Sequence, residues 1–224
     1  MDFELIIESL PKLLKATELT LLLVGMTIIL GIVLAFVVAL LRVSPKKYFR
    51  WPAYGYIFFF RGSPLLVQLF LIYYGLSQFE FVRESILWPI FRQPLWCALL
   101  AFCLNTAAYT GEVLRGAIEA VPAGQIEAGK AMGMSKWLLF RRIVLPQAVR
   151  IALPAYSNEV IYTIKDSSLA SAVTLLELTG MARNIVARTY KPIEIFLVTS
   201  CIYLFLVFIA TRVFKRVEKQ LRCP

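Results

Sequence analysis

A carboxylate and an aromatic ring lie one helical turn apart in the middle of an apolar segment. Glu159 follows Asn158, and Tyr162 comes three residues later. A carboxylate beside an aromatic face suits a guanidinium or ammonium group, through charge and through cation–π attraction. We therefore hypothesise that Glu159 attracts a cationic group of a ligand. The alternative is an internal ion pair, with Arg61 or Arg150 as the partner of Glu159.

Other polar residues repeat at helical spacing in three apolar segments. One stripe comprises Asn105, Tyr109 and Glu112, a second comprises Glu159, Tyr162 and Asp166, and Arg61 and Gln68 are spaced to share a face. An ionisable group inside a bilayer costs about 2.5–3.5 kcal/mol on insertion scales, so each one needs a protein or water environment. The three stripes predict a hydrated path between helices.

The same side chains have a structural interpretation. Arg61 would pair with a carboxylate, or with carbonyl groups freed at Ser63-Pro64, where Ser63 would cap a shortened helix that starts at Pro64. Asn105 would hydrogen-bond one helix to another, and the tyrosines would pack. The sequence leaves both interpretations open.

Residue types exclude several other kinds of site. The chain has no histidine, so it can form neither a histidine metal site nor a Ser/His/Asp triad. Its four cysteines are scattered, which indicates buried apolar residues and not a disulfide framework. Residues 124–131 read GQIEAGKA and lack the final Ser or Thr of a phosphate-binding loop. We expect no catalytic residue, no metal and no nucleotide site on this chain.

The composition is that of a membrane protein. Hydrophobic residues make up 59% of the 224 residues, more than a soluble core of this size needs. About 20 apolar helical residues cross a bilayer. We therefore predict an all-α integral membrane fold with five spans, at Leu19–Leu41, Tyr54–Leu76, Leu95–Ile118, Ile143–Ile164 and Ile193–Phe214.

The distribution of charge predicts the orientation of the chain. The formal net charge is +10, and cations concentrate around residues 42–50, 115–142 and 212–222. The alternate connections, 80–92 and 165–191, hold fewer cations and more balancing acids. This is the positive-inside pattern, so the basic balance indicates orientation and not nucleic-acid binding. We expect the N-terminus outside and the C-terminus in the cytoplasm, in agreement with an odd number of spans.

We expect one membrane domain with two short ends. Residues 1–16 are predicted to form an amphipathic surface helix, residues 17–215 the membrane domain and residues 216–224 a cytoplasmic tail.

Residues 122–142 form a charged segment between the third and fourth spans. Pro122 is suited to start a short helix, and Gly133 to end it in a left-handed conformation. Ser135 is suited to cap a second helix, Lys136–Val144, that runs into the next span. Small residues leave one face of the first helix without bulk, so that another protein can approach its backbone: Ala128, Gly129, Ala131 and Gly133.

This segment resembles the EAA motif of the permease subunits of ATP-binding-cassette (ABC) importers. The match comprises Glu127-Ala128-Gly129, Gly133 and Ile143–Pro146, with Gly129 in place of the usual Ala. Residues 61–68 (RGSPLLVQ) and 153–160 (LPAYSNEV) are similar to polar amino acid permeases of the histidine, arginine and opine uptake type. The resemblance covers roughly residues 17–215.

The resemblance implies a fold and a set of partners. The fold is that of a type I ABC importer permease, whose cytoplasmic coupling helices dock on a separate ATPase. By position, this role falls to Gln125, Glu127, Ala128, Gly129, Gly133, Met134 and Ser135. The implied location of this chain is the bacterial inner membrane. The implied partners are an ATPase dimer that binds ATP and magnesium, a second permease subunit, and a periplasmic amino-acid-binding protein.

The implied function is import of polar and in particular cationic amino acids, such as arginine, lysine, histidine, ornithine or opines. The expected pathway residues are Glu159, Asn158, Tyr162, Asn105, Tyr109, Glu112, Gln68 and Arg61. Import of glutamine or glutamate is an alternative, as is a channel that does not use ATP, although the sequence has no repeated filter segment or charge ring. Open questions are which amino acid is carried, whether the partner permease is identical or a sister subunit, and whether the central site lies in this chain.

Overall fold

The computed structural model describes residues 2–221, and every regular element within them is helical. Three helices there are long and apolar enough to cross a membrane alone: α1 (Phe3–Arg42), α6 (Pro94–Glu119) and α11 (Pro192–Leu221). A fourth crossing results if α2 (Lys47–Gly62) and the bent segment Leu65–Gln78 form one broken span. α9 (Leu145–Asp166), which is interrupted by charged residues, is not among them. The count of five spans stays a prediction.

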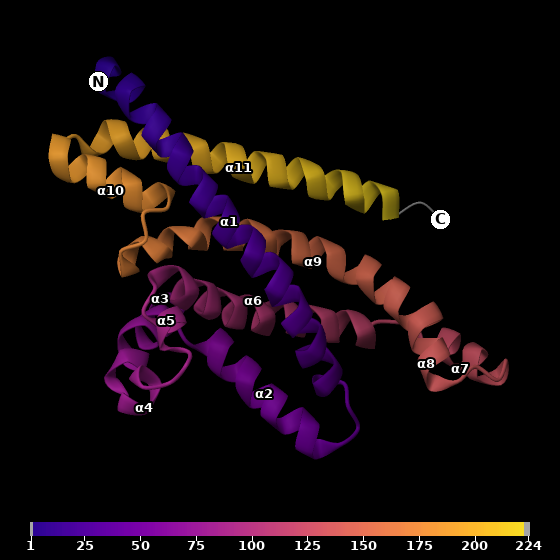
Figure 1. The fold of residues 1–224 in the computed structure, drawn as a ribbon. Helices are drawn as coiled ribbons and strands as arrows, with labels where there is room; N and C mark the ends of the chain where they lie inside the picture. The colour runs from indigo at the N-terminus through magenta and orange to yellow at the C-terminus, as the bar shows by residue number, and fades with distance from the viewer. Residues whose placement is uncertain (1, 222–224) are drawn as a thin grey trace.

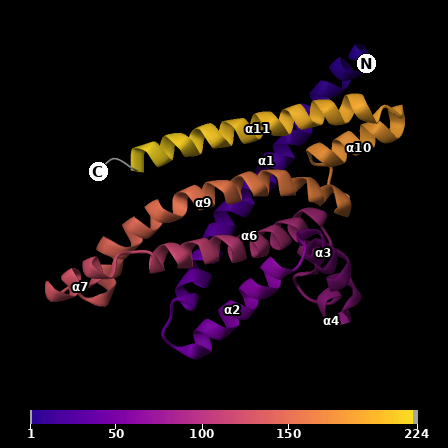
Figure 2. The same cartoon turned by 180° about the vertical axis from the view of Figure 1, so that it is seen from behind.

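The long helices form a layer that α1 crosses (Figure 1). α6, α9 and α11 lie side by side, and α2 turns back from the end of α1 to pack on α6. α7 (Ala123–Ala131) and α8 (Lys136–Leu139) project together at the end of α6, as the reverse view also shows (Figure 2). The short helices α4 (Glu80–Arg83) and α5 (Trp88–Phe91) precede the opposite end of α6.

α1 and α6 pack closely because the residues that face each other are small. A Cβ atom on Gly31 would lie 3.2 Å from the Thr106 side chain, and one on Gly111 would lie 3.3 Å from the Ala35 carbonyl oxygen. Close backbone approach increases van der Waals contact between helices in lipid, where no hydrophobic effect drives their association. This interface holds α6 in place, and α6 supplies one wall of the cavity described below.

A buried carboxylate joins α10 (Leu178–Thr189) to two neighbouring helices. Glu177 is 0% exposed and caps α10, since its oxygens accept hydrogen bonds from the Thr179 and Gly180 backbone N–H groups at 2.9 Å each. Tyr203 of α11 donates to Glu177 at 2.9 Å, and the Thr20 hydroxyl of α1 donates to it at 3.5 Å. Burying a carboxylate is costly unless it is hydrogen-bonded. The charge pattern of the sequence places Glu177 in an aqueous connection and misses this role.

Long helices run through both predicted ends of the membrane domain. α1 is continuous from Phe3 to Arg42, so residues 3–16 are not a separate helix. The domain boundary at residue 16 stays a prediction. Lys191 donates a hydrogen bond to the Asp2 carboxylate, which holds the pKa of Asp2 below its ordinary value. α11 continues through Leu221, and residues 222–224 of the predicted tail lie outside the described residues.

Replacing Gly180 with Ala is expected to destabilise the fold. A Cβ atom there would lie 2.1 Å from the Leu175 carbonyl oxygen, so the backbone must shift at a cost of about 1–3 kcal/mol or more. Thermal unfolding of the purified protein in detergent measures the effect as a lower midpoint. The control is Gly116→Ala, whose Cβ meets nothing within 4 Å and whose helix propensity improves. An unchanged midpoint for Gly180→Ala would contradict the contact.

Candidate functional site

The chain breaks and bends sharply between α2 and α3 (Leu65–Phe70). The chain changes direction by 105° between the two parts of the broken span. Ser63 is extended, with ψ 146°, because the Pro64 ring disfavours a helical conformation of the preceding residue. The predicted capping is wrong by one residue. Pro64 itself occupies the cap position of α3, and the Ser63 hydroxyl donates to the Phe59 carbonyl at 2.7 Å.

Two amide side chains satisfy the carbonyl groups that the break frees. The Gln68 side-chain N–H groups donate to the Phe60 carbonyl, the Ser63 carbonyl and the Ser63 hydroxyl, each at 2.9 Å. Asn105 of α6 donates to the same Phe60 carbonyl at 3.2 Å and to the Gln68 side-chain oxygen at 3.0 Å. An unsatisfied backbone group inside a bilayer costs several kcal/mol. Gln68 and Asn105 therefore hold the broken backbone in place.

This network revises the interpretation of the second span. Arg61 and Gln68 do not share a helical face, because the 105° bend lies between them. Gln68 was predicted to line the pathway. It is instead 2% exposed and is not among the residues that line the cavity described below. The freed carbonyl groups are bound by Gln68 and Asn105, and not by Arg61.

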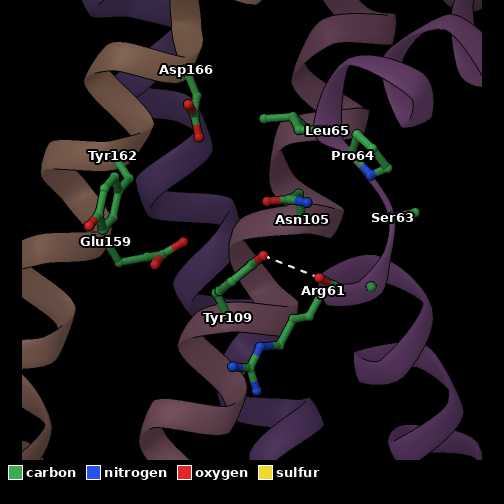
Figure 3. A pocket seen from close by; sticks show the side chains of 10 residues that line it. Arg61, Ser63, Pro64, Leu65, Asn105, Tyr109, Glu159, Tyr162 and Asp166 are labelled. Carbon is green, nitrogen blue, oxygen red and sulfur yellow. Dashed lines mark hydrogen bonds between the residues drawn. The ribbon is translucent and has the colours of Figure 1, made fainter.

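A cavity of about 580 Å³ lies between the break, α6 and α9 (Figure 3). α9 contributes Glu159, Tyr162 and Asp166, which are spaced at i, i+3 and i+7 and so point to one side. α6 contributes Asn105 and Tyr109 from the opposite side. The predicted convergence of polar stripes from three segments is thus realised for these residues. Asn158 is exposed and does not line the cavity.

Arg61 closes one end of this cavity without an ion pair. Its guanidinium carbon lies 5.1 Å from the centre of the Tyr109 ring, and the Tyr109 hydroxyl donates to the Arg61 carbonyl at 3.4 Å. Among residues 2–221 no carboxylate oxygen lies within 4.0 Å of a guanidinium nitrogen of Arg61 or Arg150. The internal ion pair considered for Glu159 is therefore not formed in this part of the chain. Figure 3 shows the Arg61 guanidinium and the Asp166 carboxylate at opposite ends of the cavity.

Glu112 belongs to a different environment from the rest of its stripe. It accepts hydrogen bonds from the Arg115 guanidinium at 2.6 and 2.9 Å, and its second oxygen lies 3.9 Å from Arg42. It lines an adjoining cavity of about 370 Å³ together with Arg61 and Tyr109. The predicted stripe of α6 thus spans two cavities, of which Glu112 lines only the second.

The segment between α6 and α9 folds as its sequence predicts. Gly133 has a φ of +76° and ends the turn after α7, and the Ser135 hydroxyl accepts a hydrogen bond from the Leu138 N–H at 3.3 Å. α8 continues through a π-helical turn, Phe140–Val144, directly into α9. Two short helices at a bend are therefore confirmed.

Gly129 has a different role from the one predicted. It is buried, and a Cβ atom on it would lie 2.8 Å from the Ile143 Cδ1 atom and 3.1 Å from the Leu139 Cδ1 atom. The absence of a side chain at Gly129 thus allows α7 to pack on α8 and the turn after it, and this face of α7 is covered by the chain itself. Met134 is partly buried in the same contact. The outer surface is formed by other residues, including Gln125, Glu127, Ala128, Gly133 and Ser135, and by the unpredicted Met132 and Trp137, which are 79% and 70% exposed.

A small apolar core fixes these helices to the two walls of the cavity. It joins Ala117 and Val121 at the end of α6 to Leu139 of α8 and to Ala148 and Ala152 of α9. A force on α7 and α8 therefore acts on α6 and α9 together. Among the described residues, no group of three or more His, Cys, Asp or Glu side chains is placed to hold a metal ion.

Comparison with known proteins identifies the relatives of this chain. Residues 27–222 match the family described as "binding-protein-dependent transport system inner membrane component". The nopaline transport system permease protein NocM of Agrobacterium fabrum is 53% identical over 213 residues, which cover 95% of this chain and 88% of that protein. The histidine/lysine/arginine/ornithine transport system permease protein HisM of Escherichia coli K12 is 43% identical over 203 residues, covering 90% of this chain and 85% of HisM.

Solved structures have the same fold. A chain of an amino acid ABC transporter, determined with histidines, superposes with a TM-score of 0.88 at 30% identity and covers 98% of this chain and 99% of that one. A chain of the MetNI methionine ABC transporter in an inward-facing conformation gives a TM-score of 0.76 at 18% identity, over 94% of this chain and 96% of that one. At 18% identity, the comparison with MetNI shows only that the two chains share a fold.

Replacing Gln68 with Leu is expected to destabilise the bend. The variant keeps a similar volume but leaves the Ser63 carbonyl without its donor, at a cost of about 1–3 kcal/mol for a buried group. The thermal unfolding midpoint in detergent should fall accordingly. Ser63→Ala serves as the comparison, because it removes the partly buried hydroxyl but leaves the Phe60 and Ser63 carbonyl groups bound to Gln68, and it should cost less. If both variants unfold at the same temperature as the unaltered protein, the amide network does not support the bend.

Proposed function

The chain belongs to the family of binding-protein-dependent transport system inner membrane components, and from this premise we propose that it is the permease subunit of an ABC importer for basic amino acids or opines. Relatives that cover most of the chain carry nopaline in one case and histidine, lysine, arginine and ornithine in another. These substrates combine a carboxylate with a basic side-chain group. Family membership also favours an ATP-driven importer over the channel alternative.

The observation that carries the proposal is the charge arrangement of the first cavity. Two carboxylates, Glu159 and Asp166, line it with one guanidinium, that of Arg61. A basic amino acid has the complementary pattern, since its cationic side chain suits the carboxylates and its α-carboxylate suits Arg61. Tyr162 also lines the cavity and can offer one face of its ring to the cationic group, while the Lys165 Nζ atom lies 5.4 Å from the ring centre. The Tyr109 ring holds Arg61 instead. With one more carboxylate than guanidinium, the cavity favours a cationic substrate over glutamine or glutamate.

The proposed coupling follows from the connection of α7 and α8 to the cavity walls. A partner ATPase dimer would bind ATP and magnesium and contact the exposed surface around Ala128, Met132 and Trp137. Its closure would displace α7 and α8 and, through their apolar core, α6 and α9. Those helices carry Tyr109 and Glu159 on opposite walls, so their relative motion would open the cavity to alternate sides of the membrane.

The proposed importer contains further subunits and has a defined orientation in the membrane. A second permease subunit, a sister chain or an identical one, would complete the pathway, and an external binding protein would deliver the substrate. The positive-inside pattern supports an external N-terminus and a cytoplasmic C-terminus. α7 and α8 belong to the cation-rich stretch 115–142, which lies on the cytoplasmic side in this orientation.

Replacing Glu159 with Gln is expected to weaken binding of L-arginine about 10- to 100-fold, since it removes a charge that contacts the guanidinium. The measurement is equilibrium binding of radiolabelled arginine to the complete permease–ATPase complex in nanodiscs, without the binding protein. Citrulline, the neutral isostere of arginine, should bind equally to both forms. Glu84→Gln, at an exposed position outside the cavity, is the matched control. Unchanged arginine affinity in Glu159→Gln would contradict this role.

Replacing Ala128 with Trp is expected to disrupt docking of the ATPase. Ala128 is exposed, so the permease should fold normally, but a large side chain at a tight interface should weaken association about tenfold or more. Co-purification with the ATPase, at equal permease abundance, measures the loss. Ala128→Ser keeps the side chain small and should retain the ATPase. Full recovery of the ATPase with Ala128→Trp would place the interface elsewhere.

A further inference from the structure

The second cavity begins where the first one ends. It has a volume of about 370 Å³, and Arg61, Gly62 and Tyr109 belong to the walls of both cavities. Beyond this shared wall the lining changes, because Arg42 and Glu112 take the place of Glu159 and Asp166. Arg61 therefore lies between a cavity with two carboxylates and a cavity with a second arginine.

Arg42 and Arg61 are held in the same way, each against an aromatic ring. The Arg42 guanidinium carbon lies 5.1 Å from the centre of the Tyr54 ring, the same distance as that from Arg61 to Tyr109. Tyr54 and Arg61 are seven residues apart on α2, which places them on one face about 10 Å apart along the axis. Stacking on a ring leaves the in-plane N–H groups of a guanidinium free for a carboxylate.

Arg42 is only loosely engaged by the nearest carboxylate. Its Nε atom lies 3.9 Å from the Glu112 Oε2 atom, beyond hydrogen-bonding distance. Within residues 2–221 both atoms are buried and have no hydrogen-bond partner. The other Glu112 oxygen accepts two hydrogen bonds from Arg115, which offsets much of the carboxylate's charge. The second cavity thus has a guanidinium available to an anionic group.

The order of charges along the two cavities is a pair of carboxylates, then Arg61, then Arg42. We propose that the second cavity binds a second carboxylate of the substrate, through Arg42. The substrates that could use this subsite are the opines already included in the proposed function, because an opine of a basic amino acid carries an additional carboxylate on the α-nitrogen. This inference rests on the proposed function, since it takes the first cavity as the site of the basic group and of the α-carboxylate.

Two ligands that differ by this one group test the inference. L-arginine has one carboxylate, and octopine is arginine with a carboxyethyl group on its α-nitrogen. Equilibrium binding of each is measured on the permease–ATPase complex in nanodiscs without the binding protein. The unaltered complex should bind octopine about tenfold more tightly than arginine. Arg42→Gln should abolish this difference, while its affinity for arginine stays within about twofold of that of the unaltered complex. Arg50→Gln removes the same charge from an exposed position that does not line the second cavity and should change neither affinity.

A second variant changes octopine affinity in the opposite direction. Glu112→Gln removes the carboxylate that competes for Arg42, so octopine should bind about two- to fivefold more tightly. This result decides the matter even if Arg42→Gln fails to fold. Octopine that binds no better than arginine, or a Glu112→Gln complex with unchanged octopine affinity, overturns the inference. Arginine binding by the unaltered complex would then still support the proposed function, whereas binding of neither ligand would contradict both.

Discussion

A backbone inside a bilayer must satisfy its own polar groups, and the structure of this chain depends on how it meets that constraint. The turn at Ser63-Pro64 frees carbonyl groups that no helix can bind. Gln68 and Asn105 bind them, from α3 and α6, so the break is held by side chains of two elements. The bend directs α3 away from α2 and makes room for a cavity beside α6. The site therefore follows from the hydrogen bonds of the bend.

The charges of the cavity follow from helix geometry on the opposite wall. The i, i+3, i+7 spacing of α9 places Glu159 and Asp166 on one helical face with Tyr162 between them, and Arg61 lies at one end of the cavity over the Tyr109 ring. None of these three charged groups pairs with another among the described residues. Charges that are not paired within a membrane protein need water or a ligand. A zwitterionic substrate with a basic side chain supplies such partners to all three.

Sequence reasoning succeeded where the determinants are local. Gly133, Ser135 and the residues after them specify their turn and cap by their own conformational preferences, and helical spacing sufficed to group Glu159 with Tyr162. It failed where partners are distant in sequence. The burial of Gly129 depends on Ile143, the burial of Glu177 on Tyr203 and Thr20, and the role of Gln68 on carbonyl groups across the bend. Neither residue spacing nor composition predicts these contacts, because each contact forms only when separate helices pack together.

The central claim is that the cavity between the bend, α6 and α9 is the binding site of a basic amino acid. A cryo-electron microscopy structure of the complete importer, prepared with L-arginine, tests it most directly. The account predicts ligand density in this cavity, with the guanidinium about 3 Å from Glu159 or Asp166 and the carboxylate next to Arg61. Arginine density found only in the partner permease subunit, with this cavity empty or filled by lipid, would contradict it.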